Sequence, residues 1–467
     1  MEEERYSYQE DDISVIVERY ERMRKNNENY FFDVVEFESI IDYYLENNDV
    51  SFAFEAVESA YIQHPQSVSL QLRRAKVLID KGRAVDALKN VKIIESLEPD
   101  NFEVFLIKGA ALGMLGDIKG ARKNFDHALT LDESEEVAIL LSITSILYNL
   151  NHYKILLPYL HSLVELEPDF YTHLYDLAYA YEKLDRYEEA IEFYQLFLDK
   201  APFSDSGWYN LGILYNKTNR LKEAVEAYDY ALAVNPDNIF ALFNKGNILS
   251  SMGEYPQALE VYLEYLEQET ESSEALTYAG ECYDRTGDRE MAGRYYQEAI
   301  DLDPGFSEPW YGMGVIFLRD NIIDEAIYYF RKSVELEQEN PEYHYYLGMA
   351  LAAGSQQKEG ARSFMQALKM DPFYDIVWKD LGRLIVSEGM YFKVVSILEK
   401  ALKITGDVHG LRYVLASSYL YCGEADKCYH NLSKAFVMSE DSFKLFRELF
   451  PDHLLSEDIK QLLLLKD

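Results

Sequence analysis

Residues 205–238 read DSGWYNLGILYNKTNRLKEAVEAYDYALAVNPDN. The apolar and aromatic residues of this stretch fall into two blocks, and within each block they recur every three or four positions, as on one buried face of an α-helix. A polar run at 217–220 separates the blocks, and the second block ends shortly before a proline, which cannot continue a helix. The stretch therefore predicts a pair of packed helices. The first helix is expected to start with Asp205 or Ser206 as its N-cap, and the second to cover 221–234.

The same pattern returns along the chain with a period of about 34 residues. The period is marked by Pro65, Pro99, Pro168, Pro202, Pro236, Pro304 and Pro372. The position numbers of successive prolines in this set differ by 34, 69, 34, 34, 68 and 68. The acidic turn at 132–136 is the simplest place for the one extra residue, because surface turns tolerate insertions. A chain of 467 residues is too long for one ordinary core. The period therefore predicts a stack of helix pairs, each burying its apolar face on its neighbours.

Within the unit, small and large residues alternate in a way that suits closely packed helices. Gly212, Ala224 and Ala231 stand where two helix axes approach, and aromatic side chains fill the remaining space. The full order of the unit resembles the tetratricopeptide repeat, a pattern of W-x2-L-G-x2-Y, A-x3-F, A and P; it is carried here by Trp208, Leu211, Gly212, Tyr215, Ala224, Tyr228, Ala231 and Pro236. The resemblance implies an all-α, right-handed superhelical solenoid of about twelve such repeats.

The resemblance divides the chain into three parts. Residues 34–442 hold the repeats, 1–33 form an acidic segment with a capping helix, and 443–467 form C-terminal capping helices. Terminal repeats need such caps because one face of each lacks a neighbour. The C-terminal prediction rests on a helical stripe, a proline stop and an N-cap serine, namely Phe443, Phe446, Leu449, Phe450, Pro451, Leu455, Ser456, Ile459, Leu462 and Leu463. A dimerisation helix is the alternative for this end, and the divergent unit at 137–170 is assigned no role.

Composition excludes several classes of partner. Lys and Arg number 45 against 82 Asp and Glu, a formal net charge of −37, which disfavours nucleic acid and anionic membrane surfaces. The acidic start, MEEERYSYQE, lacks the features of a secretory signal, and no apolar run is long enough to span a bilayer. With only three cysteines, the chain is expected to be cytoplasmic, with its thiols reduced.

No motif in the sequence carries catalytic chemistry. The nine histidines lack metal-binding spacing, and the phosphate-binding loop and the nucleophile elbow are both missing. Adjacent acids such as Glu188 and Glu189 are expected at the start of a helix, where they favour the helix dipole. The sequence therefore predicts a protein that is not an enzyme and that needs no cofactor or metal.

Binding residues follow from the resemblance rather than from the residues alone. In the family, the inner face of the first helix of each repeat lines a concave groove that holds peptides or protein segments. Carried over slot by slot, this groove would show Tyr175, Tyr179, Tyr209, Asn216, Phe240, Phe243, Asn247, Tyr311 and Tyr345. Rigid aromatic rings with amide groups are typical of a binding surface, and we expect them to be exposed. The alternative is that neighbouring helices or a terminal segment cover them.

One known ligand of the family is disfavoured by the sequence. Members that grip the C-terminal carboxylate of heat-shock chaperones use a set of Lys, Asn and Arg residues on three successive first helices. Lys379 and Arg383 match the last part of this set. The two preceding slots hold other residues, Tyr345 with Met349 and Tyr311 with Val315. The incomplete set argues against a chaperone-tail adaptor.

The function implied by the resemblance is a non-enzymatic scaffold that binds a peptide or protein segment in the concave groove. Two alternatives belong to other classes. A ligand-gated regulator would sense a small peptide or metabolite and change the pitch of the solenoid. A self-assembling subunit of a larger complex would form homo-oligomers through its terminal helices. The sequence does not name the partner.

Overall fold

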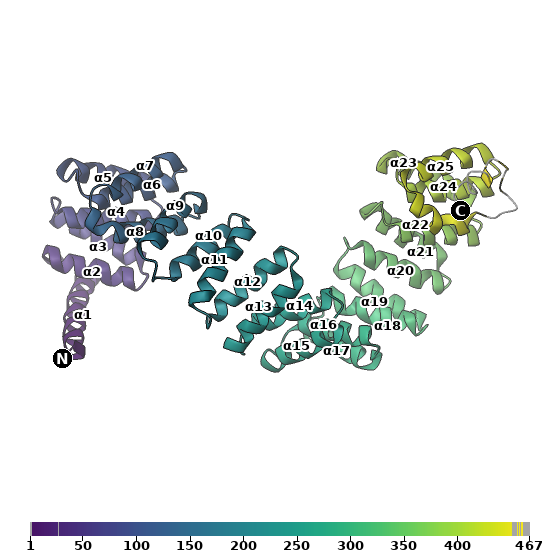
Figure 1. Cartoon of the computed structure of the whole chain (residues 1–467), viewed down its shortest axis with the longest axis horizontal. Coiled ribbons are helices and arrows are strands. Elements are labelled where there is room, and N and C mark those ends of the chain that lie inside the picture. Colours follow the sequence, from purple (N-terminus) through teal and green to yellow (C-terminus); the bar gives the residue numbers. More distant parts are fainter. Residues whose placement is uncertain (1, 27, 451–454, 456, 458, 461–467) are drawn as a thin grey trace. The chain divides into compact units, whose positions relative to one another are not determined.

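The computed structural model describes residues 2–26, 28–450, 455, 457, 459 and 460, with side chains from residue 13 onward. All regular structure in these residues is helical, as the repeat pattern predicts (Figure 1). The chain forms two compact units, Met1–Val234 and Asn235–Asp467.

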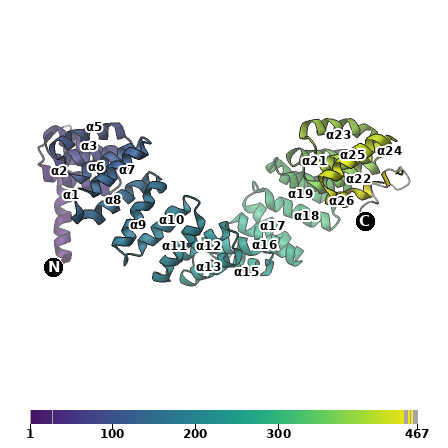
Figure 2. The ribbon, with the colours of Figure 1, turned by 45° about the horizontal axis from the view of Figure 1, so that its top comes forward.

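The first unit is built from α1 to α13, which can be followed in Figure 1 and Figure 2. Its helices are α1 (Glu2–Asn26), α2 (Val34–Glu46), α3 (Val50–Gln63), α4 (Val68–Asp80), α5 (Ala84–Leu97), α6 (Phe102–Met114), α7 (Ile118–Leu129), the 3-10 turn η1 (Glu133–Glu135), α8 (Glu136–Asn149), α9 (Tyr153–Leu166), α10 (Thr172–Glu182), α11 (Tyr187–Lys200), α12 (Asp205–Lys217) and α13 (Leu221–Val234).

The second unit is built from α14 to η2. Its helices are α14 (Ile239–Ser251), α15 (Tyr255–Gln268), α16 (Ser273–Thr286), α17 (Arg289–Leu302), α18 (Ser307–Arg319), α19 (Ile323–Leu336), α20 (Pro341–Ala353), α21 (Gln357–Met370), α22 (Asp375–Ser387), α23 (Tyr391–Thr405), α24 (His409–Tyr421), α25 (Ala425–Met438), α26 (Glu440–Phe446) and the 3-10 turn η2 (Arg447–Leu449).

From α2 to α25 the helices form twelve pairs, and we name the first helix of each pair helix A and the second helix B. The turn between them contains one residue with a positive φ in every pair, namely Asn48, Gly82, Gly116, Asn151, Asp185, Asn219, Gly253, Gly287, Asn321, Ser355, Gly389 and Gly423. Asn, Asp and Gly adopt this left-handed backbone most readily, which explains every one of these residues except Ser355. These positions keep the period of the repeat, except that one extra residue falls between Gly116 and Asn151, a span that contains η1. The insertion thus falls where the sequence places it.

In six of the pairs, a glycine of helix A faces a large aromatic residue of helix B. A Cβ atom on Gly212 of α12 would lie 2.7 Å from the ring of Tyr228 on α13, which is too close for any side chain. The same contact recurs in other pairs, as Gly109 with Phe125, Gly246 with Tyr262, Gly280 with Tyr296, Gly314 with Phe330 and Gly348 with Phe364. The glycine is therefore a packing residue, and it lets the two helix axes approach.

The tryptophan and proline of the repeat are linked by a hydrogen bond. The indole N–H of Trp208 donates to the carbonyl of Pro202, six residues earlier, at 2.9 Å. The same bond joins Trp310 to Pro304 at 3.2 Å and Trp378 to Pro372 at 2.8 Å. It ties the turn between pairs to the first turns of helix A, so the two marker residues of the repeat act together.

The start of α12 corrects one detail of the sequence prediction. Helix α13 has the predicted bounds, but the N-cap of α12 is Ser204 and neither Asp205 nor Ser206. The hydroxyl of Ser204 accepts a hydrogen bond from the backbone N–H of Gly207 at 3.1 Å. Three polar residues in a row offer three acceptors, and the sequence does not show which of them has the extended backbone of a cap.

Removing this cap gives a test of the local geometry. Ser204→Ala is expected to lower the free energy of unfolding by about 1 kcal/mol, because the N–H of Gly207 loses its acceptor. Ser204→Asp keeps an acceptor and should stay within a few tenths of a kcal/mol of the unaltered chain. Urea denaturation followed by circular dichroism measures both. Equal losses in the two variants would show that the hydroxyl does not act as a cap.

The two ends of the described chain bury apolar side chains against the neighbouring pairs. Val17, Tyr20 and Met23 of α1 are buried together with Phe32 and Phe37. At the other end, α26, η2 and the residues after them contribute a cluster of buried side chains, namely Phe443, Phe446, Leu449, Phe450, Leu455 and Ile459. Pro451, Ser456, Leu462 and Leu463, which the sequence assigns to a capping helix, lie outside the described residues.

Candidate functional site

The residues predicted to line a groove belong to helices A of both units. In the first unit, Tyr175 and Tyr179 lie on α10. Tyr175 is half-buried between Tyr194 and Phe197, and burial raises its pKa above the ordinary value for tyrosine. Its hydroxyl oxygen accepts a hydrogen bond from the side chain of Asn210 on α12, at 2.8 Å. This bond joins two successive helices A.

The other three residues of the first unit that were predicted to line the groove differ in exposure. Tyr179 is half-buried, with Tyr148 and Tyr153 each 6.2 Å away between ring centroids and the ammonium group of Lys183 4.8 Å from its ring. Tyr209 on α12 is also half-buried, beside Tyr228, whereas Asn216 on the same helix is exposed.

In the second unit, the predicted residues of α14 also divide into exposed and packed ones. Phe240 is 67% exposed. Phe243 joins an aromatic cluster with rings of α15 and α16, namely Tyr262, Tyr265 and Tyr278. The oxygen of Asn247 accepts a hydrogen bond from the hydroxyl of Tyr262 at 2.6 Å. Phe243 and Asn247 therefore support the packing of α14, and Phe240 presents a free ring.

Tyr311 of α18 lies in the wall of a pocket with a volume of about 360 Å³. The pocket is formed by three successive helices A of the second unit, α16, α18 and α20, together with Tyr296 of α17. The hydroxyl of Tyr311 donates to Glu342 at 2.7 Å, and its ring stacks on Tyr343 at 5.0 Å between centroids. Burial, reinforced by Glu342, raises the pKa of Tyr311. Tyr278 also lines the pocket, so its ring connects the pocket to Phe243.

The charges that line this pocket do not balance. Four carboxylates face two guanidinium groups, and two of the acids are paired, Asp284 with Arg319 at 2.6 Å and Glu281 with Arg285 at 3.2 Å. Among the described residues, Glu308 and Glu342 accept side-chain hydrogen bonds only from hydroxyl groups, those of Ser307 and Tyr311. Within the described chain neither carboxylate has a basic partner, so the pocket carries two uncompensated negative charges beside aromatic rings.

Tyr345 corrects the expectation of an exposed aromatic row. It is only 8% exposed, and its hydroxyl donates to Asp380 of α22 at 2.9 Å. Burial raises its pKa, and Asp380 adds to the effect. The rings of Tyr346, Phe364 and Tyr374 surround it, with centroids 5.2, 6.0 and 5.6 Å from its own. Neighbouring helices therefore cover this ring, which is the alternative that the sequence left open.

The two basic residues of the incomplete chaperone clamp are engaged within the chain. Lys379 and Arg383 of α22 both contact the carboxylate of Glu448 in η2, at 2.8 and 2.7 Å. The C-terminal segment therefore supplies an internal carboxylate to this pair. The side of α22 that carries these two residues is therefore occupied by the chain itself.

Some residues of the Tyr311 pocket were missed by the sequence prediction. Glu308 and Glu342 stand two and three repeat periods after Phe240. Glu281 stands one period after Asn247. Their positions in the repeat could therefore have identified these acids as pocket residues. The sequence prediction considered only aromatic and amide side chains at those positions, so it did not include them.

The described residues contain neither a metal-binding cluster nor a membrane-spanning helix. They contain no group of three or more His, Cys, Asp or Glu side chains placed to hold a metal ion. No helix within them combines the length and apolar character needed to cross a membrane.

Comparisons with known proteins agree with the helix pairs. Family models of the tetratricopeptide repeat match residues 145–205, 206–238, 227–260 and 273–306. No curated protein sequence matches the chain.

Several solved structures are similar to this chain. MamA from Desulfovibrio magneticus RS-1, from residue 41 to its end, is 23% identical over 36% of this chain and 95% of its own, with a TM-score of 0.35. YrrB, described as a TPR protein with an unusual peptide-binding site, is 19% identical over 39% and 93%, with a TM-score of 0.33. A structure of Naa15/Naa10 bound to HypK-THB is 13% identical over 85% and 67%, with a TM-score of 0.39.

The residues that the family models match include the packing glycines Gly212, Gly246 and Gly280, and the hydrogen bond from Trp208 to Pro202. With its stacked helix pairs, the chain is a tetratricopeptide-repeat protein.

Proposed function

We propose that this protein is a non-enzymatic scaffold that binds an extended segment of another protein on its helices A, with the Tyr311 pocket as the principal site. Tetratricopeptide repeats support a role in protein interaction in general. The observation that carries the finer proposal is the pocket of about 360 Å³, where three helices A surround Tyr311 with unpaired carboxylates and aromatic rings. Such a mixture of rigid rings and charged groups suits the recognition of a polar segment.

The chemistry of the pocket favours a basic ligand. Glu308 and Glu342 lack a basic partner within the described chain, so a Lys or Arg side chain entering the pocket would find two carboxylates. The faces of Tyr278 and Tyr311 would add cation–π attraction to the same side chain. The net charge of −37 would also speed the approach of a basic segment.

We propose a second binding surface in the first unit, formed by the residues that were predicted there to line the groove. Tyr175 and Tyr209 lie on successive helices A that are joined through Asn210, and Asn216 is exposed nearby in the same helix as Tyr209. Half-buried rings of this kind offer area without losing much side-chain entropy on binding. We propose that this surface contacts the bound protein through ring faces and amide groups.

We also propose that the protein works in the cytoplasm. Its three cysteines, Cys282, Cys422 and Cys428, are free thiols, which suits a reducing compartment such as the cytoplasm. Burial raises the pKa of the Cys282 and Cys428 thiols to about 12, so neither forms a reactive thiolate at neutral pH. The thiols therefore serve packing in this proposal.

A labelled peptide tests the proposed site. A fluorescein-labelled ten-residue peptide of alternating Lys and Ser is titrated with the full chain, and its anisotropy reports binding. Glu308→Gln with Glu342→Gln is expected to weaken binding by about tenfold or more, because the two uncompensated charges are removed. A peptide with Glu in place of Lys should not bind.

The control changes the same charge elsewhere. Glu264 on α15 and Glu298 on α17 are exposed acids of helices B that do not line the pocket. Glu264→Gln with Glu298→Gln should leave binding nearly unchanged. If this control weakens binding as much as the pocket variant does, the attraction belongs to the whole acidic surface, and the proposed site is wrong.

A further inference from the structure

The pair α22 and α23 departs from all the others. Along the rest of the chain helix A and helix B of a pair pack closely, whereas α22 makes few contacts with α23 and packs instead on α24. Gly382 of α22 is the packing glycine of this pair. A Cβ on it would meet Leu449 of η2 at 2.7 Å and Val414 of α24 at 3.3 Å. These two side chains fill the place that the large side chain of helix B takes elsewhere.

An open apolar groove results from this displacement. It has a volume of about 730 Å³ and lies between α21, α22 and α23. Its floor is the apolar face of α22, with Trp378, Leu381 and Ile385. Only Leu398 is buried on α23, whereas Ile397 is 50% and Ile404 is 84% exposed. The slot of Ile397 is buried in two closed pairs, where Ala227 and Val261 are only 2% and 5% exposed, so an apolar side chain that such a pair would cover faces solvent here.

The rim of the groove is basic in an otherwise acidic protein. Lys358, Arg362 and Lys369 of α21 and Lys393 of α23 line it, and no acid does so among the described residues. These four cations are exposed, and no ion pair within the described chain holds them. Glu359, which follows Lys358 directly, is engaged elsewhere, with Arg331 at 2.8 Å.

The dimensions of the groove suit a helix. Lys358, Arg362 and Lys369 share one face of α21, and from the first to the last they span about 16 Å at 1.5 Å per residue. This length equals about three turns of a helix lying alongside. An amphipathic helix recognises such a groove by an apolar stripe spaced at i, i+3 or i+4 and i+7. The basic rim requires acids beside that stripe.

We propose that this groove, formed by α21, α22 and α23, binds an acidic amphipathic helix of a partner protein. The partner's apolar stripe would cover the exposed Ile397 and Ile404 of α23, and its Asp or Glu side chains would face the lysines and the arginine of α21. This site is separate from the Tyr311 pocket, and it selects the opposite charge. The protein would then hold a basic segment and an acidic helix at different places in the second unit.

A designed helix tests the proposal on the full chain. The probe is a fluorescein-labelled 18-residue peptide with a Leu stripe flanked by Glu, compared with a peptide that carries Lys in place of Glu and with a scrambled sequence. We expect the Glu peptide to bind most tightly. Ile397→Asp should weaken its binding by about tenfold or more, since it puts a charge into the apolar wall.

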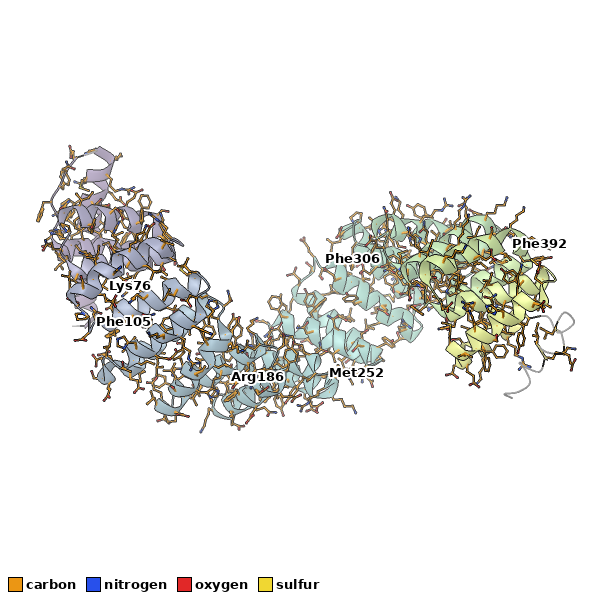
Figure 3. All side chains as sticks on the ribbon, turned by 90° about the horizontal axis from the view of Figure 1, so that it is seen from above. Lys76, Phe105, Arg186, Met252, Phe306 and Phe392 are labelled. Carbon is orange, nitrogen blue, oxygen red and sulfur yellow. The ribbon has the colours of Figure 1, made fainter. Side chains whose placement is uncertain are left out.

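The matched control lies on the same helix. Phe392 of α23, labelled in Figure 3, is 67% exposed but does not line the groove. Phe392→Asp should therefore leave binding unchanged, and circular dichroism should show that both variants keep their helix content. Lys358→Glu with Arg362→Glu and Lys369→Glu should reverse the preference, so that the Lys peptide binds more tightly than the Glu peptide.

Several outcomes would overturn the proposal. Equal binding of the Glu, Lys and scrambled peptides would show that the groove has no such specificity, as would equal losses in Ile397→Asp and Phe392→Asp. Deletion of residues 461–467 tests whether the chain's own end is the occupant, since peptide binding that appears only after deletion would identify it. A concentration-dependent dimer in sedimentation velocity that Ile397→Asp abolishes would assign the groove to a second copy.

Discussion

Raising the pH above about 10 is expected to destabilise the second unit steeply, with a slope that approaches about 3 kcal/mol per pH unit from two tyrosines alone. Tyr262 and Tyr296 occupy the large-residue slot of their helices B and are only 1% and 4% exposed. Burial raises the pKa of both hydroxyls well above the value of about 10 for an exposed tyrosine. The unfolded chain therefore releases these two protons above pH 10 while the folded unit retains them.

The direction of the effect follows from this difference. A folded state that holds more protons than the unfolded state loses stability as pH rises, by about 1.4 kcal/mol per pH unit for each such group. The stabilisation is fully present below the unfolded pKa and disappears as pH rises toward the folded pKa. Tyr311 and Tyr345, whose pKa values are also raised by burial, should add to the same slope.

The chain itself offers the control for this prediction. Phe330 and Phe364 fill the same slot in α19 and α21, so a phenyl ring fits there. In Tyr262→Phe with Tyr296→Phe, the fall in stability between pH 10 and 11 should shrink by about 2 kcal/mol, because exposed tyrosines are only partly ionised at the lower end of this range. Urea denaturation followed by circular dichroism at successive pH values measures it. An unchanged slope would show that these hydroxyls are not held protonated by the fold.

The repeat period explains why so much of the fold could be predicted. Each marker residue serves a contact inside its own pair or the next, so the period carries the structure with it. Gly212 faces Tyr228, and Trp208 bonds to Pro202, all within a single repeat period. The N-cap of α12 escaped because it depends on the backbone of Ser204, and adjacent residues have equally suitable side chains.

The candidate site could be predicted only in part, because the period fixes a residue's place on a helix but not what covers it. Tyr311 and Tyr345 stand in the same slot, yet Tyr311 lines a pocket whereas Asp380 and surrounding rings enclose Tyr345. Glu308 and Glu342 share the slot of Phe240, and their importance comes from the lack of basic partners within the described chain. Such pairings join different repeats and vary from one to the next.

The groove beside α22 could not be predicted from the period at all. Gly382 keeps the repeat's phase, and nothing in the sequence indicates that Leu449 covers it, because these residues are far apart in the chain. Leu449 belongs to a terminal turn outside the repeats. A contact of this kind depends on how the C-terminal segment folds back, which local patterns do not encode.

Substitutions in the contact between helix A and helix B are expected to lower the stability of the fold strongly. Phe330→Ala is expected to lower the free energy of unfolding by about 3 to 5 kcal/mol, because Phe330 is fully buried and its removal leaves a cavity. Gly314→Val should cost about 1 to 3 kcal/mol, since its Cβ would lie 2.6 Å from that ring.

Combining the two substitutions separates this contact from general destabilisation. Val at 314 would partly fill the space that Phe330→Ala opens, so the double variant should lose less stability than the sum of the single losses. Tyr328 of the same helix is 50% exposed, and Tyr328→Ala should cost far less than Phe330→Ala. Urea denaturation gives the free energies, and hydrogen exchange of α18 and α19 shows where the loss occurs. Additive losses would mean that the glycine and the ring do not share one contact, and that the glycine is not what lets the two helices of the pair approach.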